Sequence, residues 1–272
     1  MVSPRNCAAD RIQKRGFCKA PLDAVVHGSM VHTGEEPVIS GNRGSGTVFF
    51  MGCNLGCVFC QNYTISQNCD GTVMTAPQLT EMFMELETQG VHNINLVTPS
   101  HFVPPIAEAI RLAKEKGIAL PFVYNSNGYD AIPSLEMMDG LIDIYMPDLK
   151  YADDSLGQRY SNVPDYFSVA SKALPEMYRQ VGDPVIKNGI MRRGVLIRHL
   201  VMPGLTEDSM AVLDWIKANL PTALVNVMPQ YYPYYRVEEN AEYNEINRIL
   251  TDSEYQAATD YLVKLGLQDG SV

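Results

Sequence analysis

Short apolar runs alternate along this chain with longer segments in which apolar residues recur at helical spacing. In residues 76–89, Leu79, Phe83 and Leu86 fall on one helical face, and Thr75 precedes them as a capping residue. The predicted helices cover residues 76–89, 104–116, 132–138, 166–180, 207–219 and 254–265, the last capped by Ser253. The predicted strands cover residues 47–51, 93–97, 121–125, 143–147, 194–201 and 223–228.

Six strands that alternate with helices are typical of parallel βα units. Such units either close into a barrel or form an open, curved sheet, and the pattern alone leaves both possibilities open. Residues 1–46 show little periodicity, are rich in glycine, proline and charge, and end in turn-forming residues. We therefore expect an irregular N-terminal extension over residues 1–46 and an α/β domain over residues 47–272.

The composition narrows the class of protein. The chain has 272 residues, of which 46% are hydrophobic and 19% charged, as expected for a globular protein with a sizeable core. No stretch approaches the roughly 20 apolar residues of a membrane span, and the N-terminus has no apolar region typical of a secretory signal. The net charge is −10. A protein that binds phosphates needs a basic surface, so nucleic acid is disfavoured as the main partner.

Three cysteines lie in one short loop directly after the first predicted strand. Cys53, Cys57 and Cys60 are separated by three and then two residues. A structural zinc site uses four protein ligands, whereas a four-iron, four-sulfur cluster has four irons, each usually held by a thiolate. Three cysteines on such a cluster leave one iron open to a substrate or cofactor. Two alternatives stay open: a zinc knuckle with a remote fourth ligand, and three unrelated buried cysteines.

The spacing Cys-x3-Cys-x2-Cys, with Phe59 just before the third cysteine, resembles the signature of the radical S-adenosylmethionine (SAM) superfamily. The resemblance implies the family's partial (β/α)6 TIM-like barrel. It also implies a 4Fe-4S cluster on Cys53, Cys57 and Cys60, whose open iron binds the amino and carboxylate groups of S-adenosyl-L-methionine. One electron passed through the cluster then cleaves SAM to methionine and a 5′-deoxyadenosyl radical. Phe59 is expected to lie beside the adenine.

Polar residues follow the predicted strands at the end where βα barrels carry their functional groups. After the second strand stand Thr98 and Ser100. Radical SAM enzymes usually have a Gly-Gly-Glu-Pro-like segment at this place, whose backbone holds the methionine amino group. Because this chain lacks that segment, a loop with a helix cap stays open as the alternative for both residues.

The next two strand ends resemble segments of glycyl-radical-enzyme activases. Residues 125–128 are similar to a Thr-Asn-Gly segment that lines the cofactor site, and residues 148–150 are similar to an Asp-Leu-Lys segment. The resemblance implies a carboxylate that binds cofactor hydroxyls and an ammonium that binds a cofactor carboxylate, with a weak, exposed ion pair as the alternative. It assigns to the cofactor site Asn125, Ser126, Asn127, Gly128, Asp148 and Lys150.

The last two predicted strands also carry candidate residues. Arg198 lies in a segment similar to the activases' Arg-x-Val-Val-x-Pro-Gly, and a charge in an apolar strand is costly unless paired. We interpret Arg198 as a clamp for a carboxylate. His199 points to the opposite strand face, and a lone histidine there is more often a satisfied core residue. Gln230 and Tyr231 stand where activases often have a histidine, and we expect the tyrosines of this segment to pack the barrel mouth.

The N-terminal segment resembles the head of a subfamily related to pyruvate formate-lyase activating enzymes, and the likeness covers nearly the whole chain. Members of this subfamily carry extra cysteines in the head, but here Ser3 replaces one of them and only Cys7 and Cys18 are kept. Two thiols cannot complete a four-ligand site, so a second cluster is disfavoured, and a vestigial site or a missing upstream piece is the preferred explanation. Cys69 receives no assignment.

The resemblance makes a glycyl-radical-enzyme activase the first hypothesis, in which the radical takes hydrogen from a glycine Cα of a partner enzyme. Such an enzyme needs a protein or peptide substrate and a reducing electron donor such as flavodoxin or ferredoxin. The alternatives are radical chemistry on a small molecule or another peptide, and a non-catalytic iron–sulfur or zinc protein. A thiolate cluster requires a reducing compartment, and six cysteines in a chain of this length are no disulfide scaffold. We therefore expect the protein to be located in the cytoplasm.

Overall fold

Six parallel strands form the centre of the protein in a computed structural model that describes residues 2–270. Each strand pairs in parallel with the next, and the apolar runs of the sequence match them within a few residues. The strands are β2 (Ser45–Phe50), β4 (Ile94–Val97), β5 (Phe122–Ser126), β6 (Ile144–Pro147), β8 (Ile190–Leu200) and β9 (Leu224–Met228). This confirms the predicted α/β fold with six βα units.

The sheet is curved but open, as expected of a partial barrel. Strand β1 (Ala24–His32) lies antiparallel along β2, and β3 (Thr72–Met74) extends that edge. At the other edge, β9 pairs with the short β10 (Gln268–Asp269). Within residues 2–270, β2 and β9 therefore have other partners and do not pair with each other to close a barrel.

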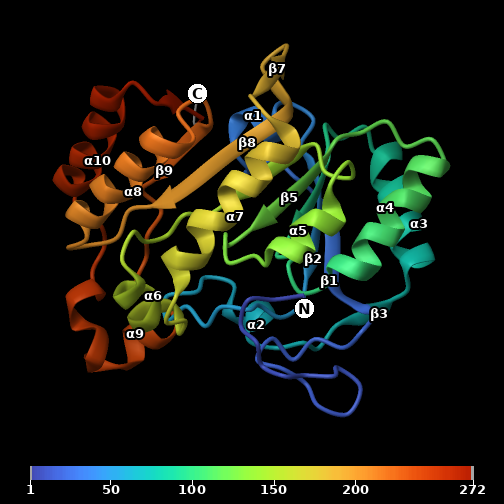
Figure 1. Cartoon of the computed structure of the whole chain (residues 1–272), viewed down its shortest axis with the longest axis horizontal. Helices are drawn as coiled ribbons and strands as arrows, with labels where there is room; N and C mark the ends of the chain where they lie inside the picture. The colour runs from blue at the N-terminus through green and yellow to red at the C-terminus, as the bar shows by residue number, and fades with distance from the viewer. Residues whose placement is uncertain (1, 271–272) are drawn as a thin grey trace.

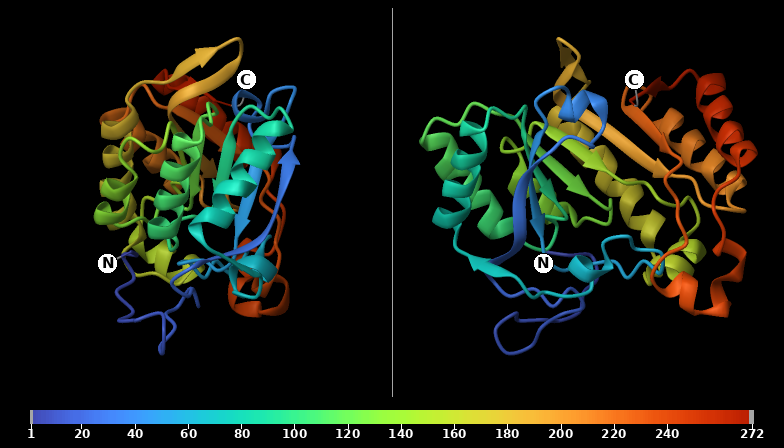
Figure 2. Two further views of the ribbon diagram at one scale, coloured as in Figure 1. Left: turned by 90° about the vertical axis from the view of Figure 1, so that its right-hand side faces the viewer. Right: turned by 180° about the vertical axis from the view of Figure 1, so that it is seen from behind.

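Helices cover the outer face of the sheet, as the turned views in Figure 2 show. In α3, Leu79, Phe83 and Leu86 are fully buried, as the helical period predicts. The covering helices are α3 (Ala76–Thr88), α4 (Val103–Glu115), α5 (Ile132–Met138), α7 (Tyr166–Val181), α8 (Thr206–Asn219) and α10 (Asp252–Leu265). Among the described residues, no helix is both long and apolar enough to cross a membrane.

The caps of two helices test the sequence analysis directly. The cap predicted for α3 is confirmed, because Thr75 and Gln78 form a reciprocal capping box. The cap predicted for α10 was wrong. Thr251, not Ser253, accepts the hydrogen bond from the Glu254 N–H, and the Glu254 carboxylate accepts one from the Thr251 N–H. Both hydroxyl residues occur within three positions of each other, so the sequence did not distinguish them.

The N-terminal extension predicted as irregular over residues 1–46 was wrong in part. Residues 24–32 form β1, whose first three residues are buried while most of the rest are exposed. β1 pairs with β3 only over its buried first three residues and with β2 from Val26 onward, so it lacks the strict alternation by which strands are recognised. The short helix α1 (Pro37–Ser40) follows, whereas residues 2–23 contain no helix or strand.

Helix α1 packs against the interior of the curved sheet. Figure 1 shows it beside the start of β8, at the end of the sheet where the parallel strands begin. Val38 and Ile39 of α1 are buried in a second, smaller apolar cluster with residues of β5, β6, β8 and β9. The amino-terminal end of the open barrel is therefore filled, which leaves the carboxyl-terminal end for a site.

Two further elements were not predicted. Residues 151–165 were expected to be a loop, but α6 (Asp154–Ser161) forms there, capped by the Asp153 carboxylate and ended at Asn162 in the left-handed conformation. The helix buries few apolar side chains, so its period is weak. Strand β7 (Val185–Lys187) pairs with the beginning of β8 and forms a projecting hairpin. The remaining short turns are α2 (Tyr63–Ser66), α9 (Arg236–Glu239) and a 3-10 helix (Ala241–Ile246).

Candidate active site

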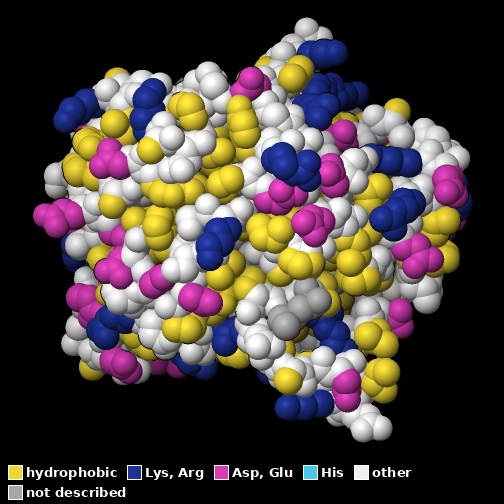
Figure 3. Space-filling model, viewed as in Figure 1, with side chains coloured by type: hydrophobic (Ala, Val, Ile, Leu, Met, Phe, Trp, Pro, Cys, Tyr) yellow, Lys and Arg dark blue, Asp and Glu magenta, His cyan; other side chains and the backbone are white. Residues whose placement is uncertain are grey.

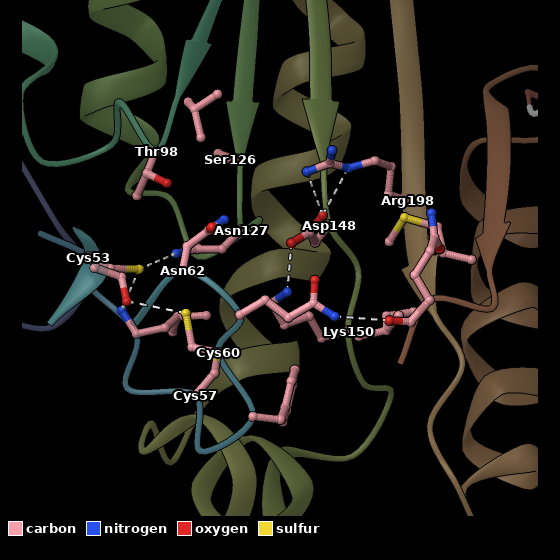
Figure 4. A pocket seen from close by; sticks show the side chains of 18 of the residues that line it. Cys53, Cys57, Cys60, Asn62, Thr98, Ser126, Asn127, Asp148, Lys150 and Arg198 are labelled. Carbon is pink, nitrogen blue, oxygen red and sulfur yellow. Dashed lines mark hydrogen bonds and ion pairs between the residues drawn. The ribbon is translucent and has the colours of Figure 1, made fainter. Parts of the chain in front are cut away.

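A cavity of about 370 Å³ lies at the carboxyl-terminal ends of the parallel strands. This is the position at which βα barrels hold their functional groups. The cluster loop (residues 51–61) forms one side, and the ends of β4, β5, β6, β8 and β9 contribute the others (Figure 4). Of the residues predicted for the site, the lining contains Cys53, Cys57, Phe59, Cys60, Thr98, Asn125, Ser126, Asn127, Asp148, Lys150 and Arg198.

The three cysteines of the cluster loop share one side of this cavity, and polar groups contact each sulfur. The side-chain amide of Asn127 and the Leu55 N–H donate to Cys53 Sγ at 3.3 and 3.4 Å. Ser161 Oγ lies 3.1 Å from Cys57 Sγ, and Ser66 Oγ lies 3.2 Å from Cys60 Sγ. Hydrogen bonds to sulfur are among the features that tune iron–sulfur clusters.

This donor set fits a multi-iron cluster. Within residues 2–270, no three His, Cys, Asp or Glu side chains converge closely enough to hold a single metal ion. A cluster of several irons requires sulfurs that are farther apart, because each thiolate then binds its own iron. Burial raises the pKa of the Cys53 thiol to about 12 and that of Cys57 to about 11. Binding to a metal deprotonates such a thiol outright, so a bound cluster offsets this cost.

The backbone before the cysteines is held in place from two sides. Gly52 adopts φ +81°, and a Cβ there would overlap the Cys18 carbonyl oxygen, so glycine is required. His101 Nε2 lies 2.7 Å from the Met51 carbonyl oxygen. Burial lowers the pKa of His101 to about 4, so the neutral ring donates this hydrogen bond. The sequence analysis did not single out His101 as a support of the loop.

Asn127 joins the cluster loop to the end of β5. Besides Cys53 Sγ, its amide also donates to Asn54 Oδ1 at 2.8 Å. Gly128 follows at φ +77°, and a Cβ on it would overlap the Asp148 carbonyl oxygen. Gly128 does not line the cavity, and the cofactor contact predicted for it stays a prediction. It lets the loops after β5 and β6 approach each other.

Asp148, Lys150 and Arg198 form a buried ion-pair network, which Figure 4 shows beneath the cavity. Lys150 Nζ lies 2.6 Å from Asp148 Oδ2, and Arg198 Nη2 lies 3.0 Å from Asp148 Oδ1. The three side chains are only 14–15% exposed, so the alternative of an exposed ion pair was wrong. Burial opposes the charged carboxylate, but the two cations outweigh it and lower the pKa of Asp148.

Arg198 is further bound by residues that the sequence analysis missed. Its Nη1 lies 3.3 Å from Glu35 Oε1 and 3.9 Å from Glu36 Oε1, and its Nη2 donates to Asn125 Oδ1 at 2.7 Å. Both glutamates precede α1 and point into the barrel from its filled end. Burial, and secondarily the neighbouring Glu36, raises the pKa of Glu35 to about 7, although Arg198 opposes this shift. No sequence signal placed this acidic pair at the site.

Residues after β4 occupy two different environments. Thr98 lines the cavity in the left-handed conformation at φ +59°, which a threonine rarely adopts. Ser100 is 1% exposed and is not part of the lining, and the cofactor contact predicted for it stays a prediction. The alternative of a helix cap was wrong, because α4 begins after Phe102 without a side-chain cap.

His199 faces away from the cavity. Its Nδ1 lies 2.8 Å from the Leu149 carbonyl oxygen, and its Nε2 lies 2.9 Å from Ser209 Oγ. The ring is buried, and burial lowers its pKa to about 4. Arg198 and His199 thus point to opposite faces of β8, as the strand alternation predicts, and His199 is a satisfied core residue.

The segment after β9 forms the outer wall of the cavity. Tyr231 is buried against Phe59 with ring centroids 5.7 Å apart, which agrees with the predicted packing role of the tyrosines. Gln61 Nε2 donates to the Gln230 carbonyl oxygen at 3.0 Å and links this segment to the cluster loop. Tyr232 also lines the cavity but is 52% exposed. The exposed side chain of Tyr232 marks where the cavity reaches solvent, beside the hydrogen bond that joins these two segments.

The remaining cysteines lie outside the cavity lining. Cys7 is exposed, Cys18 is buried and Cys69 is half-buried. All three are free thiols, and none of the described residues completes a metal site with them.

The family model of the radical SAM superfamily matches residues 47–216, which is more than half of the chain. The chain belongs to the radical SAM superfamily. It is also 32% identical over 268 residues to the uncharacterized protein MJ0674 of Methanocaldococcus jannaschii, with 96% of this chain and 73% of that protein covered. The predicted 4Fe-4S cluster and SAM are the cofactors of this superfamily and thus of this radical SAM enzyme, which sets the zinc-knuckle interpretation aside.

Solved structures share the fold at low sequence identity. SuiB of Streptococcus suis, bound to S-adenosylmethionine, has a TM-score of 0.50 and 15% identity over 82% of this chain and 44% of SuiB. The FeFe-hydrogenase maturase HydG of Carboxydothermus hydrogenoformans has a TM-score of 0.51 and 12% identity over 79% and 50%. The protein anSMEcpe with bound AdoMet has a TM-score of 0.54 and 13% identity over 86% and 62%. This radical SAM chain thus spans less than two thirds of each, and the likeness shows the fold alone.

Proposed function

We propose that this radical SAM enzyme acts on a polypeptide, and specifically that a hydrogen atom passes from a glycine Cα of a partner enzyme to the 5′-deoxyadenosyl radical, which leaves 5′-deoxyadenosine and a glycyl radical. The chemistry that the bound cofactors supply is reductive cleavage of SAM to methionine and a 5′-deoxyadenosyl radical. The observation that supports a peptide substrate is the exposed opening of the cavity. Gln61, Gln230 and Tyr232 line the cavity and are all exposed, so a chain segment can reach the cavity beside the hydrogen bond that joins Gln61 to Gln230.

The residues of the cavity have separate roles in this proposal. Cys53, Cys57 and Cys60 hold the cluster, and Asn127 orients Cys53 through its hydrogen bond to the sulfur. Phe59 is half of an aromatic pair with Tyr231 that forms an apolar wall suited to the adenine.

The ion-pair network of Asp148, Lys150 and Arg198, which forms the charged floor of the cavity, has a binding role. Asp148 and Lys150 lie side by side in the lining, where a carboxylate suits the ribose hydroxyls and an ammonium suits the methionine carboxylate. Arg198 was expected to clamp a carboxylate, but its guanidinium already contacts Asp148, Glu35 and Asn125. We therefore assign Arg198 to positioning Asp148 and Asn125. Asn125, Ser126 and Thr98 complete the lining beside the cofactor.

Radical chemistry also requires that water be excluded from the site, because a reactive intermediate must be shielded from solvent. The interior end of the cavity is closed by α1 and the buried charge network, and its exposed lining residues include Gln61 and Tyr232. A peptide that fills this opening completes the shield. A small molecule would leave the opening exposed, which is why we favour a polypeptide substrate.

The experiment has two stages. Anaerobic reconstitution with iron and sulfide, followed by reduction with dithionite in the presence of SAM, is expected to yield 5′-deoxyadenosine. Incubation with a candidate glycyl-radical enzyme is then expected to produce a glycyl radical that electron paramagnetic resonance detects. Absence of 5′-deoxyadenosine in a sample with a full cluster contradicts SAM cleavage. If small molecules stimulate the formation of 5′-deoxyadenosine and polypeptides do not, the proposed peptide substrate is wrong, but SAM cleavage stands.

A further inference from the structure

The N-terminal segment carries a charge opposite to that of the rest of the chain. Residues 2–19 contain five of the 21 basic residues but only one of the 31 acidic residues. This segment therefore carries a net charge of +4, and the remainder of the chain carries −14. Such a reversal of sign within one chain is typical of a surface that meets an anionic partner. The basic residues are Arg5, Arg11, Lys14, Arg15 and Lys19.

The basic segment lies directly against the cluster loop. Arg5 Nε donates to the Asn54 carbonyl oxygen at 2.9 Å, next to Cys53. Lys19 Nζ donates to the Gln67 carbonyl oxygen at 2.7 Å. Both orientations in Figures 1 and 2 show the blue N-terminal trace adjoining the segment that carries the cysteines. A protein bound to the N-terminal segment therefore lies beside the cluster loop and the residues that follow it.

The outer part of this segment is a preformed turn. Asp10 Oδ1 accepts hydrogen bonds from the backbone N–H groups of Ile12, Gln13 and Lys14 at 2.8–2.9 Å. These bonds hold the pKa of the Asp10 carboxyl below its ordinary value. Ile12 is 73% exposed at the tip, and Lys14 and Arg15 beside it are exposed. Ile12 is a single exposed apolar side chain, so the like charges beside it are the feature of this turn that suits an oppositely charged partner.

We propose that the turn of residues 10–19, called here the basic turn, is the docking surface for an acidic electron-carrier protein that reduces the cluster. This inference rests on the proposed function, because only reductive SAM cleavage requires such a carrier. One electron passes from the reduced carrier to the oxidised cluster. The carrier is thereby oxidised by one electron, and no bond or proton is transferred.

Charge complementarity selects an acidic carrier. The basic turn attracts an acidic protein, whereas the rest of the chain, with a net charge of −14, repels it on average; the hairpin of β7 and β8 is a second basic group (Figure 3) and serves as the control. Opposite charge increases association rates by roughly ten- to a thousandfold and makes them fall with salt. Nucleic acid is the other anionic class of partner. The observations favour the electron carrier, because the turn is small, isolated and adjacent to the cluster loop.

The experiment compares two charge-reversed variants of the full-length protein. The test variant combines Lys14→Glu and Arg15→Glu. The control combines Lys187→Glu and Arg192→Glu in the hairpin of β7 and β8, where Figure 3 shows a second group of basic side chains at the opposite end of the molecule. Both variants change the net charge by four units, so only the location of the change differs.

The first readout needs no cluster. Binding of oxidised flavodoxin to the apoprotein is measured by calorimetry at 50 and 300 mM salt. We expect the test variant to bind at least tenfold more weakly than wild type at low salt, and the control to stay within twofold. A third variant, Ile12→Ser, is expected to weaken binding about fivefold without changing the salt dependence. Equal weakening in test and control variants, or none in the test variant, overturns the proposal.

The second readout separates docking from SAM cleavage. Reduced flavodoxin is expected to reduce the reconstituted cluster at least tenfold more slowly in the test variant, while dithionite reduces both variants at the wild-type rate. If dithionite supports no 5′-deoxyadenosine formation in wild type, the proposed function fails, whereas the calorimetric result still reports docking. If the test variant loses affinity for a labelled single-stranded DNA but keeps that for flavodoxin, the turn is a nucleic-acid site and the proposal is wrong.

Discussion

Glu35 Oε1 lies 3.3 Å from Arg198 Nη1, although 163 residues separate them in the chain. The glutamate comes from the segment before α1, and the arginine comes from β8 in the centre of the sheet. The contact connects the filled end of the barrel to the floor of the cavity. Glu35 therefore acts on the site through Arg198, without lining the cavity itself.

The first prediction concerns the pH dependence of this contact. The pKa of Glu35 is raised from 4.5 to about 7 in the folded protein, so the native state binds a proton that the unfolded state releases. The free energy of unfolding therefore falls as pH rises from about 4.5 to about 7. Relative to Glu35→Gln, the free energy of unfolding of the wild-type apoprotein is expected to fall by about 3 kcal/mol between pH 4.5 and 7. Urea unfolding at several pH values measures this, and parallel curves for the two proteins would contradict it.

The second prediction tests the buried ion pairs. Asp148→Asn leaves Lys150 and Arg198 facing each other without the carboxylate between them. We expect a loss of about 3–5 kcal/mol in the free energy of unfolding, because an unpaired buried charge is costly. The double variant Asp148→Asn, Lys150→Met removes one of the cations and is expected to recover part of that loss. A double variant less stable than the single one would show that the pairing assignment is wrong.

The third prediction isolates the close approach at Gly128. Gly128→Ala combines a left-handed backbone with a clash against the Asp148 carbonyl oxygen, whereas Gly140→Ala at φ +74° meets no atom within 4 Å. The control is expected to cost about 1 kcal/mol for the backbone conformation alone. Gly128→Ala is expected to cost at least about 2 kcal/mol more, as overpacking does. Equal losses in thermal unfolding would mean that the two loops separate without cost.

The fourth prediction concerns the cluster ligands. Cys57→Ala removes one of three thiols in the cavity, whereas Cys7→Ala removes an exposed thiol outside it. After anaerobic reconstitution, Cys57→Ala is expected to lose most bound iron and all 5′-deoxyadenosine formation while its circular dichroism spectrum stays unchanged. Cys7→Ala is expected to keep both iron and activity. Wild-type SAM cleavage by Cys57→Ala would refute the cluster assignment.

The fifth prediction tests the corrected cap of α10. Thr251→Ala removes the hydroxyl that accepts the Glu254 N–H, and we expect a loss of about 1 kcal/mol. Ser253→Ala lies inside the helix and is expected to change stability by less than about 0.5 kcal/mol. Chemical denaturation of the two variants compares them directly. The reverse order of stabilities would restore Ser253 as the cap.

The fold was predictable wherever an element buries a regular apolar face. Helix α3 and strand β5 have strong periods and appeared in the sequence analysis within two residues of their bounds. Helix α6 and strand β1 were missed because their burial is partial, so that the period on which the prediction depends is weak. Whether the sheet is open or closes into a barrel depends on which strands occupy its two edges. Pairing between residues far apart in the chain decides this.

The site was predictable to the extent that it is local in sequence. The three cysteines and the polar residues at strand ends could be recognised, because parallel strands bring their carboxyl ends to one edge. Ser100 and Gly128 were predicted for the site but do not line the cavity, because a residue next to a lining residue in sequence can point elsewhere or lack a side chain. Glu35 was missed because it reaches the site from the opposite end of the barrel.

The sequence by itself determined the cluster loop, the order of the βα units and the residues at their ends, because these depend on spacing and short-range periodicity. Only the tertiary structure decided that Asp148, Lys150, Arg198 and Glu35 share one buried network, and that the basic turn lies against the cluster loop. Electrostatic energy depends on distance and burial in space. Residues far apart in the chain acquire that relationship only when the sheet curves and α1 fills its end.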